Sequence, residues 1–209
     1  MRSFEIARKV VDDKLIKYET DRCQTDTYEP AYPNAQIPEY QTTNSAGADF
    51  FCAEDVTIPS IWGIILNIVG SKAEDTVNRA LYAIAPSLCG KRDDVAANAK
   101  QEIEPTLVHT GIKACMEDDE VLELYNRSSN PSKLGLVLAN GVGVVDADYY
   151  NNVKNDGEIM FAFYNFKPWS VTIKAGDKIG QGVFKKYLRP TEGLHIKNVE
   201  RTGGFGSTN

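Results

Sequence analysis

The hydrophobic residues of this chain fall mostly into short runs, separated by turns that contain Gly, Pro and Asn. Apolar and polar residues alternate over 4–8, which predicts an opening strand, and small residues at 45–48 lead into an aromatic strand. Many short strands joined by such turns are typical of an all-β barrel or sandwich. Further strands are predicted at 107–108, 121–125, 136–138, 143–145, 159–164, 170–173 and 182–188.

Residues 61–103 have a different pattern. Ser71 and Glu74 have the spacing of a capping box, and the apolar residues that follow repeat at helical spacing until Pro86. A weaker helical segment is predicted at about 93–102. Because no helix alternates with the strands elsewhere, the block is interpreted as a helical insertion in a β domain, and a Rossmann or P-loop enzyme is disfavoured.

Length and net charge limit the domain organisation and the kinds of ligand that are expected. A chain of 209 residues can bury one sizeable core, so 1–209 is predicted to form a single domain with insertions. The polar, proline-containing region 12–43 is expected to be an irregular surface excursion. The net charge of −6 argues against a general binder of nucleic acid or membrane surfaces, so a polyanionic ligand would need a local cluster of cations.

Cysteine and histidine are too sparse and scattered for a metal motif. No C-x-x-C pair occurs, so a zinc site or a Cys/His dyad is not expected. The cysteines are instead expected to be buried free thiols in a reducing compartment. The chain begins without an apolar signal segment, and its most apolar run, 61–69, is too short to span a bilayer. A cytoplasmic protein is expected. The residues concerned are Cys23, Cys52, Cys89, Cys115, His109 and His195.

Candidate chemistry is concentrated in the stretch 125–149. Arg127 is followed by two serines, a combination that suits an anionic ligand. The Asn-Gly pair at 140–141 lies between apolar runs and is a strong hairpin signal. If the strand after this hairpin stays extended, Asp146 and Asp148 share one face of the sheet. A purely structural hairpin does not account for these charged groups at both of its ends.

The terminal stretch 201–209 carries a cation, an aromatic ring and hydroxyls between glycines. A glycine-rich terminus is usually a frayed tail. Backbone N–H groups next to glycines can also wrap phosphates, however, and a phenylalanine can stack on a base.

Five stretches, taken in order, resemble the motifs of the trimeric dUTPases, the deoxyuridine 5'-triphosphate nucleotidohydrolases. They are SAGADFF (45–51), NRSS (126–129), ANGVGVVDADYY (139–150), GDKIGQ (176–181) and RTGGFGS (201–207). The resemblance implies a distorted β-barrel of jelly-roll type. It also implies a homotrimer with active sites at the subunit interfaces.

The same resemblance implies a reaction. Asp146 is expected to orient and activate the water that attacks the α-phosphorus of dUTP, giving dUMP and pyrophosphate. Such a dUTP diphosphatase limits uracil in DNA and supplies dUMP for dTMP synthesis. Mg²⁺ is expected to be held mainly by the triphosphate and water, with Asp49 an indirect ligand through water.

Binding roles are also implied by the resemblance. Tyr149 is expected against the deoxyribose, where a rigid ring in contact with C2′ excludes UTP, since an apolar surface alone rejects an added hydroxyl by only about 10²-fold. A side-chain amide can flip, so fixed backbone groups around Gly143 and Val144 in the 140–145 hairpin are expected to select uracil. The base and sugar residues are Asn140, Gly143, Val144, Val145, Tyr149, Met160 and Phe205, and the phosphate residues are Arg127, Ser128, Ser129, Gln181, Arg201, Gly206, Ser207 and Thr208.

The chain departs from the usual family pattern at several points. Between Tyr149 and Gly157 it has the extra run YNNVKND, where the family has a very short link. Gly180 stands where alanine is common, which is expected to be a small change. The spacing after Arg201 is one residue shorter than usual, and the insertion at 61–103 is absent from the common form.

Two other functions stay open. A dCTP deaminase resembles the dUTPases in fold, although the intact terminal motif favours dUTP. A regulatory protein could use the barrel as a scaffold and the insertion at 61–103 as its contact surface for a protein partner. The regulatory and enzymatic roles could coexist.

Overall fold

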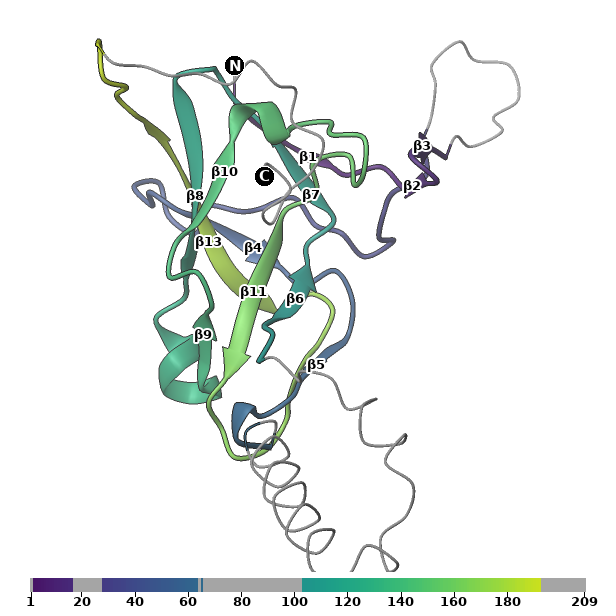
Figure 1. Ribbon diagram of the computed structural model, residues 1–209, viewed down its shortest axis with the longest axis vertical. Helices are drawn as coiled ribbons and strands as arrows, with labels where there is room; N and C mark the ends of the chain where they lie inside the picture. The colour runs from purple at the N-terminus through teal and green to yellow at the C-terminus, as the bar shows by residue number, and fades with distance from the viewer. Residues whose placement is uncertain (1, 17–27, 64, 66–102, 193–209) are drawn as a thin grey trace, which may run out of the picture.

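The chain forms the predicted all-β fold (Figure 1). The computed structural model describes residues 2–16, 28–63, 65 and 103–192. The π-helix η3 (Asn130–Leu134) and the 3-10 helix η4 (Ala147–Tyr149) lie among the described strands. The strands are β1 (Ser3–Ile6), β2 (Val10–Val11), β3 (Lys14–Leu15), β4 (Ala48–Phe51), β5 (Val56–Ile58), β6 (Thr106–His109), β7 (Ile112–Cys115), β8 (Glu120–Asn126), β9 (Leu136–Leu138), β10 (Gly143–Asp146), β11 (Met160–Asn165), β12 (Val171–Ile173) and β13 (Lys178–Lys186).

The described strands pair into antiparallel sheets. The largest sheet has the order β10-β8-β13-β4, and a second has the order β6-β11-β9. The pairs β1-β7, β12-β5 and β2-β3 make up the remaining ladders of the described residues. In Figure 1, β10, β8 and β13 are neighbours on the left of the molecule, with β11 and β6 to their right. Strand β8 is central in the large sheet and therefore connects the parts that carry the site.

Aromatic rings fill the space between these two sheets. Phe50 of β4 packs against Phe161 of β11 with ring centroids 5.6 Å apart, and Phe161 lies 6.2 Å from Phe163. A Cβ atom on Gly180 of β13 would lie 2.0 Å from Cε1 of Phe161. The expectation that glycine is a small change at 180 is therefore wrong, because the Phe161 ring occupies the space that an alanine methyl group needs.

Part of the region 12–43 is more regular than predicted. Strands β2 and β3 form a hairpin, and the two residues of its turn, Asp12 and Asp13, have φ values of 50° and 58°. Both values are left-handed, as a two-residue type I′ turn requires, and Asp is among the residues that tolerate them. Strands β5 and β7 were not predicted either.

Two predicted segments lie wholly or largely outside the described residues. Of the insertion at 61–103, the structure describes 61–63, 65 and 103, and 61–63 are helical. The terminal motif at 201–209 lies outside the description. The helical insertion and the single-domain organisation therefore stay predictions.

Candidate active site

Four side chains meet at one end of the large sheet. Gln181 of β13 lies opposite Asp49 of β4 in the ladder, and its Nε2 donates to Oδ1 of Asp49 at 2.9 Å. Nζ of Lys178 lies 2.9 Å from the other carboxylate oxygen of Asp49. Arg127, directly after β8, donates from Nη1 to the backbone O of Lys178 at 2.9 Å. The structure thus brings together residues from three stretches of the predicted site.

Asp49 holds this cluster in place. Its side chain is buried, and burial raises the pKa of its carboxyl, but hydrogen bonds from Gln181 and Lys178 and the nearby positive charges lower that pKa below the ordinary value overall. The ionised carboxylate therefore fixes the positions of both partners. Lys178 was missed in the sequence, where a lysine in a turn before a strand gives no signal of a carboxylate far away along the chain.

The loop with Arg127, Ser128 and Ser129 is shaped by a buried asparagine. Nδ2 of Asn130 donates to Oδ1 of Asn126 and to the backbone O of Ile179, both at 2.7 Å. Gly135, in the left-handed region with φ of 66°, ends the η3 turn that follows. These contacts hold the loop against β13 and leave Ser128 exposed and Ser129 half-buried. The flanking asparagines were the only sequence signal of this support.

The second group of predicted residues begins at the turn 139–142. Gly141 has a φ of 70°, which confirms the turn at the Asn-Gly pair. The hairpin expected there is wrong, since β9 pairs with β11 whereas β10 pairs with β8. The turn therefore carries the chain from one sheet to the other. Within β10, Gly143 and Val145 are buried and Val144 is exposed, and Asn140 in the preceding turn is exposed as well.

Asp146 is the last residue of β10, and it is half-buried. The chain then turns into η4, with Asp146 at its N-cap position. The expectation that Asp146 and Asp148 share a sheet face is therefore wrong, because the two-residue periodicity of a strand ends between them. Asp148 lies on the helical turn and is exposed.

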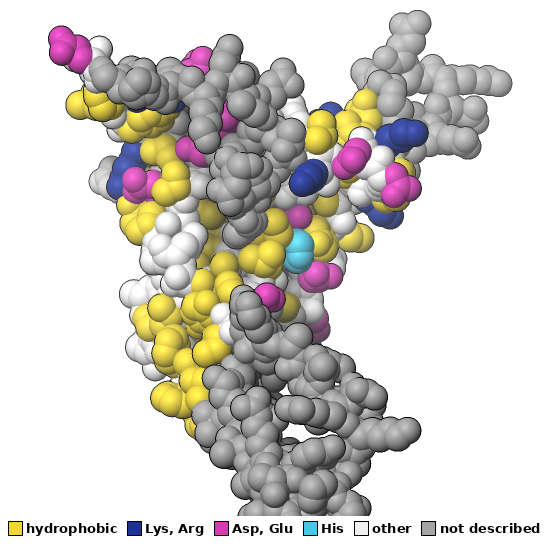
Figure 2. Space-filling view, in the orientation of Figure 1, with side chains coloured by type: hydrophobic (Ala, Val, Ile, Leu, Met, Phe, Trp, Pro, Cys, Tyr) yellow, Lys and Arg dark blue, Asp and Glu magenta, His cyan; other side chains and the backbone are white. Residues whose placement is uncertain are grey.

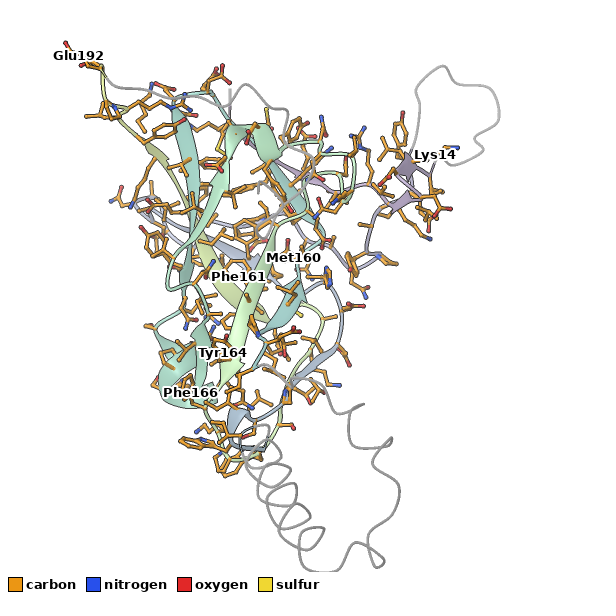
Figure 3. All side chains as sticks on the ribbon, viewed as in Figure 1. Lys14, Met160, Phe161, Tyr164, Phe166 and Glu192 are labelled. Carbon is orange, nitrogen blue, oxygen red and sulfur yellow. The ribbon has the colours of Figure 1, made fainter. Side chains whose placement is uncertain are left out.

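Tyr149 ends η4 with its ring in the core. The side chain is 6% exposed, and its Oη donates to the backbone O of Glu158 at 3.0 Å. Met160 lies shortly after Glu158, at the start of β11 (Figure 3). The structure therefore places Asp146, Tyr149 and Met160 in one region, at the junction of β10 and β11.

Asp146 and Arg127 lie at opposite ends of β8, whereas Gly143, paired with Leu124, lies near the Arg127 end. Asp146 is paired with Val121, near the start of β8, and Arg127 follows its last residue. At the rise of an extended strand, this separation is about 20 Å. Within one copy of the chain, Asp146 and Arg127 are thus too far apart to contact the same phosphorus atom.

The described residues contain no group of three or more His, Cys, Asp or Glu side chains placed to hold a metal ion. Cys52 and Cys115 are free thiols. Five predicted contacts lie outside the described residues, namely Arg201, Phe205, Gly206, Ser207 and Thr208.

In the part of the chain that the structure describes, every helix is too short or too polar to cross a membrane.

Comparison with known proteins decides the family. The dUTPase family model matches residues 91–209, which is more than half of the chain. This chain belongs to the dUTPase family. The matched part contains β8, β10 and β13, and hence most of both residue groups of the candidate site. In this dUTPase-family chain, Asp49 of β4 is the predicted site residue that precedes the match.

Individual relatives match between half and nine tenths of the chain. A deoxyuridine 5'-triphosphate nucleotidohydrolase of Lactococcus lactis subsp. lactis is 50% identical over 105 residues, covering 50% of this chain and 70% of the relative. The protein of the same name from Wolinella succinogenes is 30% identical over 181 residues, covering 85% and 89%. The crystal structure of a dUTPase from Streptococcus mutans aligns with a TM-score of 0.56 and 30% identity, covering 90% of this chain and 98% of that one.

Proposed function

We propose that this chain hydrolyses dUTP to dUMP and pyrophosphate. Its membership of the dUTPase family supports the activity. The structural observation that carries the proposal is the position of Asp146, a half-buried carboxylate at the end of β10, directly before the turn that buries Tyr149. In this proposal, Asp146 serves as the base for water, and the nearby Tyr149 ring packs against the deoxyribose.

In this proposal, Asp146 acts as the general base. An aspartate carboxylate is too weak a base to generate free hydroxide, so it accepts the proton of water only as the new O–P bond forms at the α-phosphorus. The bond from that phosphorus to the bridging oxygen breaks, pyrophosphate leaves, and dUMP keeps the added oxygen. The rest of the rate increase comes from holding the phosphates in line and neutralising their charge.

The phosphates would be held by a neighbouring copy of the chain. Arg127, Ser128, Ser129 and Gln181 are proposed to bind the phosphates, and Arg127 lies about 20 Å along β8 from Asp146 of the same copy. We therefore propose a homotrimer with active sites between subunits. The terminal residues Arg201, Phe205, Gly206, Ser207 and Thr208 would close over the bound nucleotide.

Exposed apolar surface supports this assembly. Figure 2 shows hydrophobic side chains gathered along one side of the molecule. Val144 and Trp169 are each 63% exposed, and Phe166 at the lower end of the view in Figure 3 is 48% exposed. Apolar surface of this kind is typical of a protein–protein contact.

Uracil would be selected by the backbone of β10. This strand is at the edge of the large sheet, with β8 as its partner among the described strands. Every second residue of such an edge directs its N–H and C=O groups away from the partner strand. Alternate residues among Gly143, Val144 and Val145 can therefore present fixed donors and acceptors to the base, and Asn140 and Met160 are proposed as further contacts.

Mg²⁺ fits this site as a companion of the substrate. The described donor set lacks a carboxylate cage, and Mg²⁺ commonly keeps several waters and binds through substrate phosphates. When bound, it would neutralise charge on the triphosphate. Any contribution of Asp49 would pass through water, since its carboxylate oxygens accept hydrogen bonds from Gln181 and Lys178.

A nucleotide panel tests the proposed function. Purified protein with Mg²⁺ is given dUTP, dCTP, dTTP or UTP, and pyrophosphate is measured. Rapid release from dUTP alone is expected. Asp146→Asn should abolish it while the assembly, measured by sizing, persists, and the exposed control Asp118→Asn should keep the wild-type rate. Ammonia from dCTP, or full activity in Asp146→Asn, would refute the proposal.

A further inference from the structure

The loop 150–157, between η4 and β11, is anchored at its C-terminal end by a buried carboxylate and its ion pairs. Asp156 is 1% exposed and has a φ of 58°. One of its carboxylate oxygens accepts from the backbone N of Arg8 at 2.7 Å and from Arg8 Nε at 2.9 Å, and lies 3.0 Å from Nζ of Lys113. The next residue, Gly157, has a φ of 82°. The C-terminal end of the loop therefore has one defined conformation.

The same loop surrounds the hydroxyl of Tyr149. Nδ2 of Asn155 donates to Oη of Tyr149 at 2.8 Å, and that Oη donates to the backbone O of Glu158 at 3.0 Å. Oδ1 of Asn155 accepts from the backbone N of Gly157 at 3.2 Å. Because that N–H can only donate, the Asn155 amide has one orientation, with its NH₂ group towards Tyr149.

A second asparagine fixes the first. Nδ2 of Asn152 donates to Oδ1 of Asn155 at 2.6 Å and to the backbone O of Tyr149 at 3.2 Å. Oδ1 of Asn152 accepts from the backbone N of Asn155 at 3.2 Å. Asn152 is buried, so these hydrogen bonds are protected from water. The Tyr149 ring is thus held at its hydroxyl end and through its backbone by one closed network.

We propose that Asn155 is a positioning residue for substrate selection, which holds the Tyr149 ring rigid against C2′ of the sugar so that a ribonucleotide is rejected. The proposal rests on the proposed dUTP hydrolysis. An apolar surface that can yield rejects an added hydroxyl only by about 10²-fold. A ring that cannot move away makes the rejection steric, and the extra run 150–156 supplies the groups that prevent its movement.

The test is the ratio of kcat/KM for dUTP to that for UTP. Asn155→Ala should lower this ratio about tenfold, as the loss of one hydrogen bond of ordinary strength implies, by raising activity on UTP, with kcat for dUTP nearly unchanged. Tyr149→Phe removes only the hydroxyl and should lower the ratio similarly. The double variant should show the same ratio as either single variant, because both changes remove the hydrogen bond between Asn155 Nδ2 and Tyr149 Oη. Val153→Ala, at a 58% exposed position of the same loop, is the matched control and should keep the wild-type ratio.

The outcomes separate this proposal from the function on which it rests. A wild-type protein that does not hydrolyse dUTP refutes the function. An active wild type whose ratio is unchanged in Asn155→Ala overturns the positioning role, and so does an equal loss of activity on both nucleotides, which is the result of general destabilisation. If Asn155→Ala does not fold, an unchanged ratio in Tyr149→Phe overturns the proposal by itself.

Discussion

Mixing two inactive variants would show whether each site is built from two copies of the chain. Asp146→Asn removes the proposed base, and Arg127→Ala removes a phosphate contact at the other end of β8, about 20 Å away in the same copy. Each variant alone should be nearly inactive. In a mixed trimer, a site that takes Asp146 from an Arg127→Ala copy and Arg127 from an Asp146→Asn copy is complete.

The expected recovery follows from random assembly. The two variants are co-expressed or refolded together in equal amounts. The copy that supplies position 146 carries Asp146 about half of the time, and the copy that supplies position 127 carries Arg127 about half of the time. About a quarter of the wild-type pyrophosphate release should therefore return. In a mixture of Asp146→Asn with Asp146→Ala, no copy supplies the Asp146 carboxylate, so the mixture should stay inactive. No recovery in the first mixture would refute the shared site.

Three further predictions concern stability, measured by urea unfolding. Gly180→Ala should lower the free energy of unfolding by about 1–3 kcal/mol through overpacking, and Phe161→Leu should recover part of the loss; additive losses would contradict this steric account. Asp156→Asn should cost about 3–5 kcal/mol, because it removes the buried carboxylate that pairs with Arg8 and with buried Lys113, and a change near zero would contradict it. The hydrogen bond between His109 and Glu158 raises the pKa of His109 above 6.5, although burial acts in the opposite direction. The contribution of this bond to the free energy of unfolding is therefore complete below pH 6.5 and is lost as the pH rises through the raised pKa. The difference in the free energy of unfolding between wild type and His109→Gln should shrink over that pH range. A difference that stays constant would refute the link between the His109 pKa and stability.

The strands were largely predictable because apolar runs and turn residues are local signals. The runs at 136–138, 143–145 and 159–164 correspond to β9, β10 and β11. Pairing was less predictable, since the Asn-Gly turn gives no information about which strand each neighbour will join. Asp146 and Asp148 were expected on one face because the strand period was extended past its end. Burial of the Tyr149 ring accompanies the turn of the chain at that point.

Within the candidate site, the sequence indicated the residues of the family motifs but not the side chains that hold them in place. Asp49, Arg127 and Gln181 come together as three separate stretches indicated. Lys178, Asn130 and Asn155 have equally specific contacts, but their partners are set by the folded structure rather than by a motif. A polar residue in a turn is usually solvated, so its sequence context carries no sign of such a role.

Hydrolysis of dUTP in ¹⁸O-labelled water tests the central claim most directly, namely that Asp146 directs water to the α-phosphorus. The label should appear in dUMP and be absent from pyrophosphate, and Asp146→Asn should form neither product. Label in pyrophosphate would place the attack on another phosphorus atom and would contradict the role given to Asp146.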